Sequence, residues 1–96
     1  MTLPFILGQF PYLKAIDDGR FRCLVWEPDS GHYVVATNLG GMDYPDLNDF
    51  MVCVYRDEQS FGDDPGTSLL DSFTSENCDD LWVAFDAAEH CVEVQP

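Results

Sequence analysis

The sequence has few basic residues. It contains four Lys and Arg against 18 Asp and Glu, which gives a formal net charge of −14 at pH 7. The shortage is greatest in residues 49–96, where twelve acidic residues accompany a single base, Arg56, for a net charge of −11. Such a surface repels the phosphates of nucleic acids and the anionic headgroups of membranes. We therefore expect the chain to bind neither of them directly.

Long hydrophobic runs are also missing. No segment approaches the roughly 20 apolar residues that a membrane-spanning helix needs. The first seven residues, Met-Thr-Leu-Pro-Phe-Ile-Leu, lack the basic region and the apolar core of a secretory signal peptide. These absences predict a cytoplasmic location.

The cysteines form no Cys-x-x-Cys pair. They are Cys23, Cys53, Cys78 and Cys91, and each lies within an apolar segment. One disulfide is possible, but the pattern favours buried free thiols in a reducing compartment. A zinc site built from Cys78, His90 and Cys91 does not match the common ligand spacings.

Signatures of catalysis are absent as well. The sequence contains no G-x-S-x-G, H-E-x-x-H, P-loop or dinucleotide fingerprint. His32 and His90 have no partner at the spacing of a catalytic dyad. The loop over 43–49 lacks the alternating ligands and the turn glycine of a calcium-binding loop. We expect no catalytic residues, no metal and no cofactor, and we predict that the protein is not an enzyme.

What the sequence does contain is enough apolar material for a core. Hydrophobic residues make up 46% of the chain and aromatic residues 14%, which argues against intrinsic disorder despite the charge. A chain of 96 residues has the length of one domain. We therefore treat residues 1–96 as a single acidic globular domain.

The clearest strands flank a turn. Residues 20–27 and 32–37 are rich in β-branched and aromatic side chains, and the Pro-Asp-Ser-Gly sequence between them forms turns readily. This pattern predicts an antiparallel hairpin. Alternation within the first run places Cys23 on one face of the sheet, and Leu24 and Trp26 on the other.

Residues 50–56 form the third predicted strand. Its nearly continuous hydrophobicity indicates an interior position in the sheet. The remaining segments are predicted to be less regular, with a short helix or turn at 12–16, loops at 38–48 and 57–68, and a turn at 69–73.

The last predicted element is a helix from Cys78 to about His90. Asn77 is its expected N-cap, and Asp79 and Asp80 fall in the first turn, where the helix dipole favours acidic side chains. The apolar residues of this segment form one stripe at helical spacing: Leu81, Phe85, Ala88 and Val92.

An alternative divides the same segment into two strands, 81–85 and 91–94. The residues between them have no turn chemistry, so the helix is favoured, with 91–94 allowed to be extended. The sequence thus predicts an α+β fold: a small antiparallel sheet of three to four strands with one C-terminal helix packed on one face.

The other side of the predicted helix carries acids around a tryptophan: Asp79, Trp82, Asp86, Glu89 and Glu93. A Trp ringed by charges is typical of an interface anchor, although a Trp can also pack at a sheet edge and an acidic face can be merely solvated. Acids of the neighbouring loop are expected to extend this surface: Asp57, Glu58, Asp63 and Asp64. We predict that these nine residues bind a partner.

The expected partner is a basic protein surface that belongs to a nucleic-acid-binding complex. Carboxylates would take the places of phosphates against its Lys and Arg side chains. This favours a phage-type inhibitor, anti-CRISPR or anti-restriction, that acts by nucleic-acid mimicry. An immunity or antitoxin-like partner of a basic nuclease toxin would use the same surface. A third interpretation is that the acidity serves only solubility.

Overall fold

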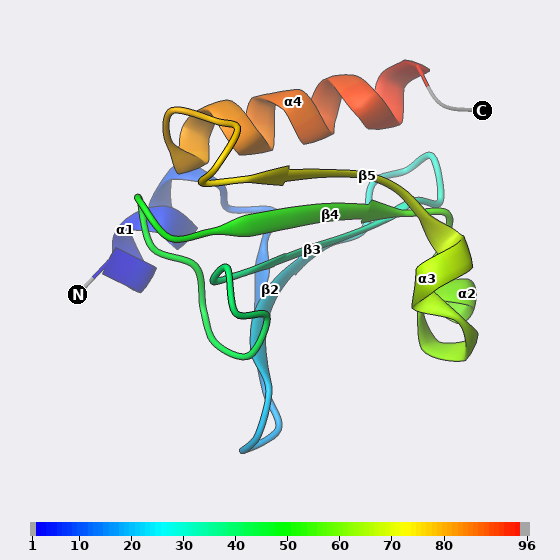
Figure 1. Ribbon diagram of the computed structural model, residues 1–96, viewed down its shortest axis with the longest axis horizontal. Helices are drawn as coiled ribbons and strands as arrows, with labels where there is room; N and C mark the ends of the chain where they lie inside the picture. Colours follow the sequence, from blue (N-terminus) through cyan, green and yellow to red (C-terminus); the bar gives the residue numbers. More distant parts are fainter. Residues whose placement is uncertain (1, 95–96) are drawn as a thin grey trace.

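The structure, a computed structural model, describes residues 2–94 (Figure 1). Its elements in chain order are α1 (Thr2–Gln9), β1 (Lys14–Asp17), β2 (Arg22–Trp26), β3 (Tyr33–Thr37), β4 (Met51–Tyr55), α2 (Glu58–Asp63), α3 (Pro65–Ser68), β5 (Leu69–Thr74) and α4 (Leu81–Val94). The strands form one antiparallel sheet in the order β1-β2-β3-β4-β5, so that every strand pairs with its neighbour in the chain. The α+β prediction is confirmed, but the sheet has five strands and not three to four.

The predicted hairpin is the middle of this sheet. Strands β2 and β3 pair antiparallel, with Val25 opposite Val35. Strand β4 lies between β3 and β5, which confirms its predicted interior position. The loop predicted at 38–48 is irregular in the structure, apart from a bridge between Asp46 and Asp49 at its end.

Both edge strands differ from the prediction. The expected helix or turn at 12–16 is wrong, because Ala15 and Ile16 pair with β2 in strand β1. The expected turn at 69–73 is also wrong, because β5 pairs along β4 and sets Phe73 opposite Val52. Neither segment shows a clean apolar alternation, since all four residues of β1 are exposed. Each is a strand because its backbone pairs with a neighbouring strand, β1 with β2 and β5 with β4.

Two short helices replace the loop predicted at 57–68. The carboxylate of Asp57 accepts a hydrogen bond of 2.7 Å from the backbone N–H of Ser60 and so caps the N-terminus of α2. Helix α3 follows after a break at Asp64. The N-terminal segment, which the sequence left without an assigned element, forms α1 over its first residues.

Helix α4 begins three residues later than predicted. The carboxylate of Asp80 accepts a hydrogen bond of 3.0 Å from the N–H of Val83, so Asp80 and not Asn77 is the N-cap. Asn77 instead closes the preceding turn by accepting a hydrogen bond from the N–H of Thr74.

The helix continues to Val94, so residues 91–94 are not extended and the two-strand alternative is wrong. Asp79 lies outside the helix.

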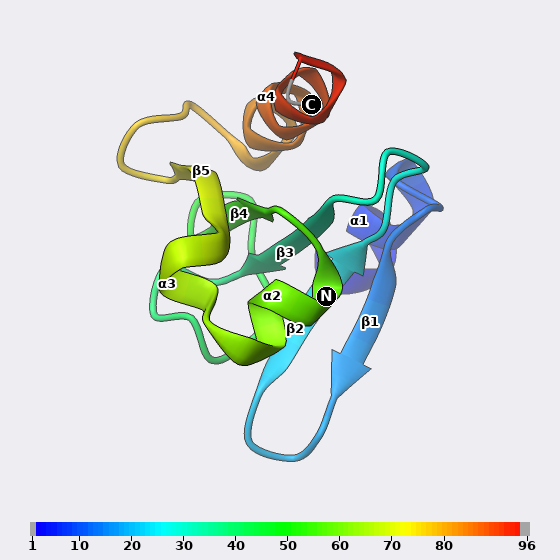
Figure 2. The ribbon, with the colours of Figure 1, turned by 90° about the vertical axis from the view of Figure 1, so that its right-hand side faces the viewer.

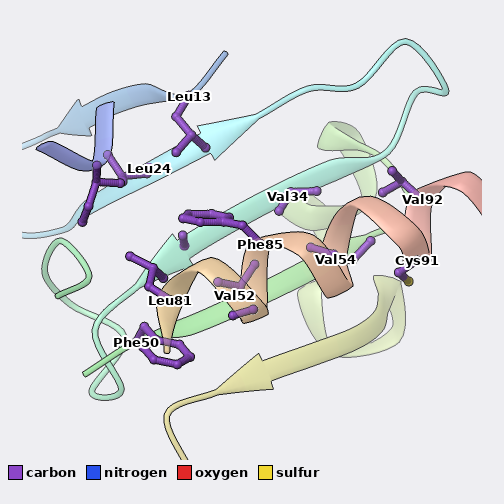
Figure 3. Packing of buried hydrophobic residues seen from close by; sticks show 14 residues of the cluster. Leu13, Leu24, Val34, Phe50, Val52, Val54, Leu81, Phe85, Cys91 and Val92 are labelled. Atoms are coloured by element: carbon purple, nitrogen blue, oxygen red, sulfur yellow. The ribbon is translucent and has the colours of Figure 1, made fainter. Parts of the chain in front are cut away.

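Helix α4 packs across one face of the sheet (Figures 1 and 2). The residues buried on its inner side are Leu81, Ala84, Phe85, Ala88, Cys91 and Val92, which include the whole predicted stripe. They pack with buried strand residues, namely Leu24, Val34, Ala36, Val52 and Val54 (Figure 3). The prediction of a C-terminal helix on one face of the sheet is therefore confirmed.

The opposite face of the sheet carries a second, smaller apolar cluster. Cys23, Val25, Tyr33 and Val35 are buried there. Helix α2 covers part of this face through Phe61, whose ring lies 5.2 Å from the Tyr33 ring between centroids. The placement of Cys23 on this face and of Leu24 on the other agrees with the predicted alternation.

All four cysteines are free thiols, and three of them are buried. Burial raises the pKa of the Cys23 thiol to about 11, and it also raises the pKa of Cys53. Among residues 2–94, no helix has both the length and the apolar composition needed to cross a membrane.

The burial of α4 predicts a clear contrast between two of its residues. Phe85 is 1% exposed and Val83 is 45% exposed. We expect Phe85→Ala to lower the free energy of unfolding by about 3–5 kcal/mol, because it removes a ring from the core and leaves a cavity. Val83→Ala should change it by about 0.5 kcal/mol or less. Urea unfolding followed by far-UV circular dichroism measures both, and equal effects would contradict this orientation of the helix.

Candidate partner-binding face

The outer side of α4 presents three of the predicted site residues together. Asp86 and Glu93 are exposed and Glu89 is partly buried. Their spacing along the helix places them on one side, and we call these three residues the acidic face. They span about 10 Å of helix, a length over which one strand of DNA carries about three phosphates.

Among residues 2–94, the acidic face forms no ion pair with a basic side chain. The three ion pairs of residues 2–94 all lie in the first half: Lys14 with Glu27, and Arg22 with both Asp17 and Asp43. No Lys or Arg occurs after Arg56. The charge of the acidic face is therefore left for solvent or for another molecule to neutralise.

A row of five aromatic rings runs beside α4. The ring of Trp82 lies 5.6 Å from that of Phe5 and 5.2 Å from that of Phe10. The row continues through Tyr12, 5.8 Å from Phe10, to Trp26, 4.8 Å from Tyr12. These are ordinary distances for attractive ring contacts. The row therefore joins α1, the turn between α1 and β1, the end of β2, and α4.

Tyr12 ties this row to the acidic face. Its hydroxyl donates a hydrogen bond of 2.6 Å to Oε1 of Glu89. Burial, together with this bond and the charge of Glu89, raises the pKa of Tyr12 well above its usual range. The bond holds the Glu89 carboxylate against the aromatic rings instead of leaving it free in solvent.

Two hollows flank this hydrogen bond. The first, the Trp26 hollow, has a volume of about 400 Å³ and is lined by Trp26, Pro28, Ser30, Glu89, Val92 and Glu93. The second, the Trp82 hollow, has a volume of about 380 Å³ and is lined by Phe10, Trp82, Val83, Asp86 and Glu89. Each hollow thus combines one Trp with two carboxylates of the acidic face. The sequence did not reveal that Phe10, Tyr12 and Trp26 lie here.

Trp82 combines both roles considered for it. It is partly buried against the core, and its ring contacts Phe5 and Phe10 of the N-terminal segment. It also lines a hollow together with Asp86 and Glu89. Asp79, the remaining predicted neighbour, is exposed in the turn before α4 and lines neither hollow.

The other predicted site residues belong to a different part of the surface. We call Asp57, Glu58, Asp63 and Asp64 the α2–α3 acids. Phe61, on the same helix, packs with Tyr55 on the sheet face opposite α4, at a centroid distance of 4.6 Å. The structure therefore does not bring the α2–α3 acids together with the acidic face (Figure 2).

Within this second group, Asp57 and Glu58 have local roles. A hydrogen bond from the N–H of Ser60 lowers the pKa of Asp57, which caps α2. A hydrogen bond with Glu27 and the charge of that residue raise the pKa of Glu58. The same contact, together with Lys14, lowers the pKa of Glu27. The two carboxyl groups therefore form a pair in which Glu58 takes up a proton first as the pH falls.

A smaller hollow lies on the far face of the sheet. Its volume is about 210 Å³, and it is lined by Phe21, Val35, Thr37, Gly41, Met51, Cys53, Tyr55 and Phe61. None of these side chains is charged, and burial raises the pKa of the Tyr55 hydroxyl. This hollow is chemically unlike the Trp26 hollow and the Trp82 hollow.

The residues considered for zinc do not converge. Cys78 precedes α4, whereas His90 and Cys91 lie near its C-terminal end. Among residues 2–94, no three His, Cys, Asp or Glu side chains are grouped as a metal site requires.

Comparison of the chain with protein-family models, with curated protein sequences and with solved structures gives no match.

The bond between Tyr12 and Glu89 predicts a pH-dependent stability effect. Tyr12→Phe should lower the free energy of unfolding by about 1–2 kcal/mol near neutral pH, because it removes a hydrogen bond to a charged group. The folded pKa of Tyr12 is raised above its ordinary value of 10.0. Its contribution is therefore complete below about pH 10 and is lost as the pH rises beyond that value.

Urea unfolding of wild type and Tyr12→Phe at mildly and strongly alkaline pH measures this effect. The difference between the two proteins should shrink above about pH 10. Tyr44→Phe removes a hydroxyl elsewhere and serves as the control. A difference for Tyr12→Phe that stays constant across this range would rule out the assigned role of the hydrogen bond.

Proposed function

We propose that this protein is a non-catalytic acidic inhibitor of the phage type, as anti-CRISPR and anti-restriction proteins are. It acts in the cytoplasm and covers the basic nucleic-acid-binding surface of a protein or nucleoprotein complex. Its acidic face takes the places of phosphates, and the aromatic row beside it supplies the apolar part of the contact.

One observation carries this proposal: three carboxylates that have no ion pair among residues 2–94 stand on α4 beside partly buried aromatic rings. Interfaces concentrate affinity in a few aromatic or Arg anchors, and charges around them steer the partners together. A merely solvated helix has no need of aromatic-walled hollows on both sides of its carboxylates. The net charge of the whole chain, −14, also attracts a basic surface at longer range.

The acidic face also has the dimensions of a phosphate mimic. Its carboxylates follow one another along about 10 Å of α4, close to the linear charge density of one DNA strand. Because α4 is packed on the sheet, its backbone holds these three residues on one side of the molecule, and the hydrogen bond from Tyr12 orients Glu89. The partner then meets a preorganised row of charges and does not have to order a flexible tail.

The proposal is tested by capture and competition. The tagged protein is incubated with host lysate, retained proteins are identified by mass spectrometry, and the affinity of each is measured over a range of salt concentrations. We expect a nucleic-acid-binding partner whose affinity falls as ionic strength rises and which DNA or RNA displaces. An affinity that does not depend on salt, or a partner that nucleic acid does not displace, would refute mimicry. A toxin as the retained partner would indicate the immunity function instead.

Two pairs of substitutions locate the contact surface. Asp86→Asn with Glu93→Gln removes two charges from the acidic face, and Glu58→Gln with Asp63→Asn removes two from the α2–α3 acids. We expect the first pair to weaken binding about three- to tenfold, since an exposed charge contributes about 1 kcal/mol or less. The second pair should leave binding within about twofold of wild type. The reverse order would place the contact on the α2–α3 acids.

Trp82→Ala tests the aromatic anchor. We expect the variant to lose about 2 kcal/mol or more of binding free energy, the usual scale of an interface hot spot. Its thermal midpoint should also fall, because contacts with Phe5 and Phe10 are lost. Binding is therefore compared at a temperature where circular dichroism shows both proteins folded. Wild-type affinity in the folded variant would exclude Trp82 from the contact and point to the loop over 43–49 or to the α2–α3 acids.

A further inference from the structure

We propose that the Trp26 hollow and the Trp82 hollow each receive an arginine side chain of the partner. This inference rests on the proposed function, because it specifies the chemistry of the basic surface that the acidic face meets.

The Trp26 hollow has the parts that an arginine side chain needs. Trp26, Pro28 and Val92 provide apolar surface for the three methylene groups of its stem. Glu89 and Glu93 provide carboxylates for the guanidinium group. The hollow contains no basic side chain, and its volume of about 400 Å³ is large enough for one side chain of this size.

The Trp82 hollow repeats this arrangement on the other side of Glu89. Trp82, Phe10 and Val83 provide its apolar surface, and Asp86 and Glu89 provide its carboxylates. Two hollows of the same chemistry, which share one glutamate, indicate recognition of two cationic side chains and not of diffuse charge.

Glu89 is suited to this shared position. Its Oε1 accepts the hydrogen bond from Tyr12, which orients the carboxylate. Among residues 2–94, the structure gives its Oε2 no hydrogen-bond partner. One oxygen of a fixed carboxylate is thus left to accept from a guanidinium group.

Arginine fits these hollows better than lysine does. Its planar guanidinium group stacks on aromatic rings, donates several hydrogen bonds in a fixed geometry and is less strongly hydrated than an ammonium group. A cation over a Trp ring contributes about 0.5–1 kcal/mol at exposed sites. Lysine would be attracted by the same carboxylates but would gain less from the tryptophans. The two hollows therefore predict that an arginine peptide binds more tightly than a lysine peptide of equal charge.

The experiment compares capped hexa-arginine and hexa-lysine peptides at physiological ionic strength. Affinities are measured by calorimetry, and the two indole Nε1–H signals are followed by NMR on the wild-type protein. We expect hexa-arginine to bind at least about fivefold more tightly, and we expect it to shift both indole signals. Equal affinity for the two peptides, or indole signals that hexa-arginine leaves unmoved, would overturn the proposal.

Variants distinguish binding in the hollows from attraction by the overall negative charge. Trp26→Leu keeps apolar volume but loses the ring, so the preference for hexa-arginine should fall about twofold or more while hexa-lysine binding stays unchanged. Glu93→Gln should also reduce the preference, whereas Asp63→Asn removes one charge from α2, on the other side of the sheet, and should not. An unchanged preference in both Trp26→Leu and Glu93→Gln would refute the Trp26 hollow.

This inference and the proposed function can fail independently. If nucleic acid displaces the captured partner but hexa-arginine and hexa-lysine bind equally, the arginine hollows are wrong and the inhibitor function stands. If arginine is preferred but no captured partner competes with nucleic acid, the hollows stand and the inhibitor function is wrong.

Discussion

The packing of the apolar stripe of α4 against the sheet is the interaction on which the rest of the molecule depends. Once Leu81, Phe85 and Val92 are buried, the rotation of the helix is fixed and the acidic face must point outward. The same contact brings Trp82 against Phe10 of the N-terminal segment, and so completes the aromatic row. The core and the candidate site are therefore two sides of one helix. A change that rotated α4 would alter both together.

The second constraint is that acidic residues in the two halves of the chain have different partners. In the first half of the chain, acids are paired with Lys14 and Arg22 or accept backbone hydrogen bonds in turns, as Asp18 does. In the second half, Asp57 and Asp80 cap helices, so part of the negative charge stabilises local structure. The acids of the acidic face have neither an ion pair nor a capping role. Their mutual repulsion is a cost to folding that a basic partner would relieve.

The sequence predicted those parts whose pattern is local. The hairpin of β2 and β3, strand β4 and the buried stripe of α4 follow from alternation, turn residues and helical spacing. The edge strands could not be predicted, because β1 is wholly exposed and only its pairing with β2 makes it a strand. The predicted site combined two groups of acids because the loop predicted at 57–68 was expected to lie beside the helix. Phe61 places α2 on the far face instead. Tyr12 and Trp26 gave no signal for a site, since their neighbour Glu89 comes much later in the chain.

The hydrogen bond between Tyr12 and Glu89 joins residues that are 77 positions apart. The rings beside it come from the first 26 residues of the chain, whereas the carboxylates come from its last helix. A nascent chain on the ribosome therefore carries four of the five rings, those of Phe5, Phe10, Tyr12 and Trp26, before Trp82 and the carboxylates of α4 have been synthesised. Until α4 docks, these rings lack their charged neighbours, and the face takes on its combined character only when α4 is in place.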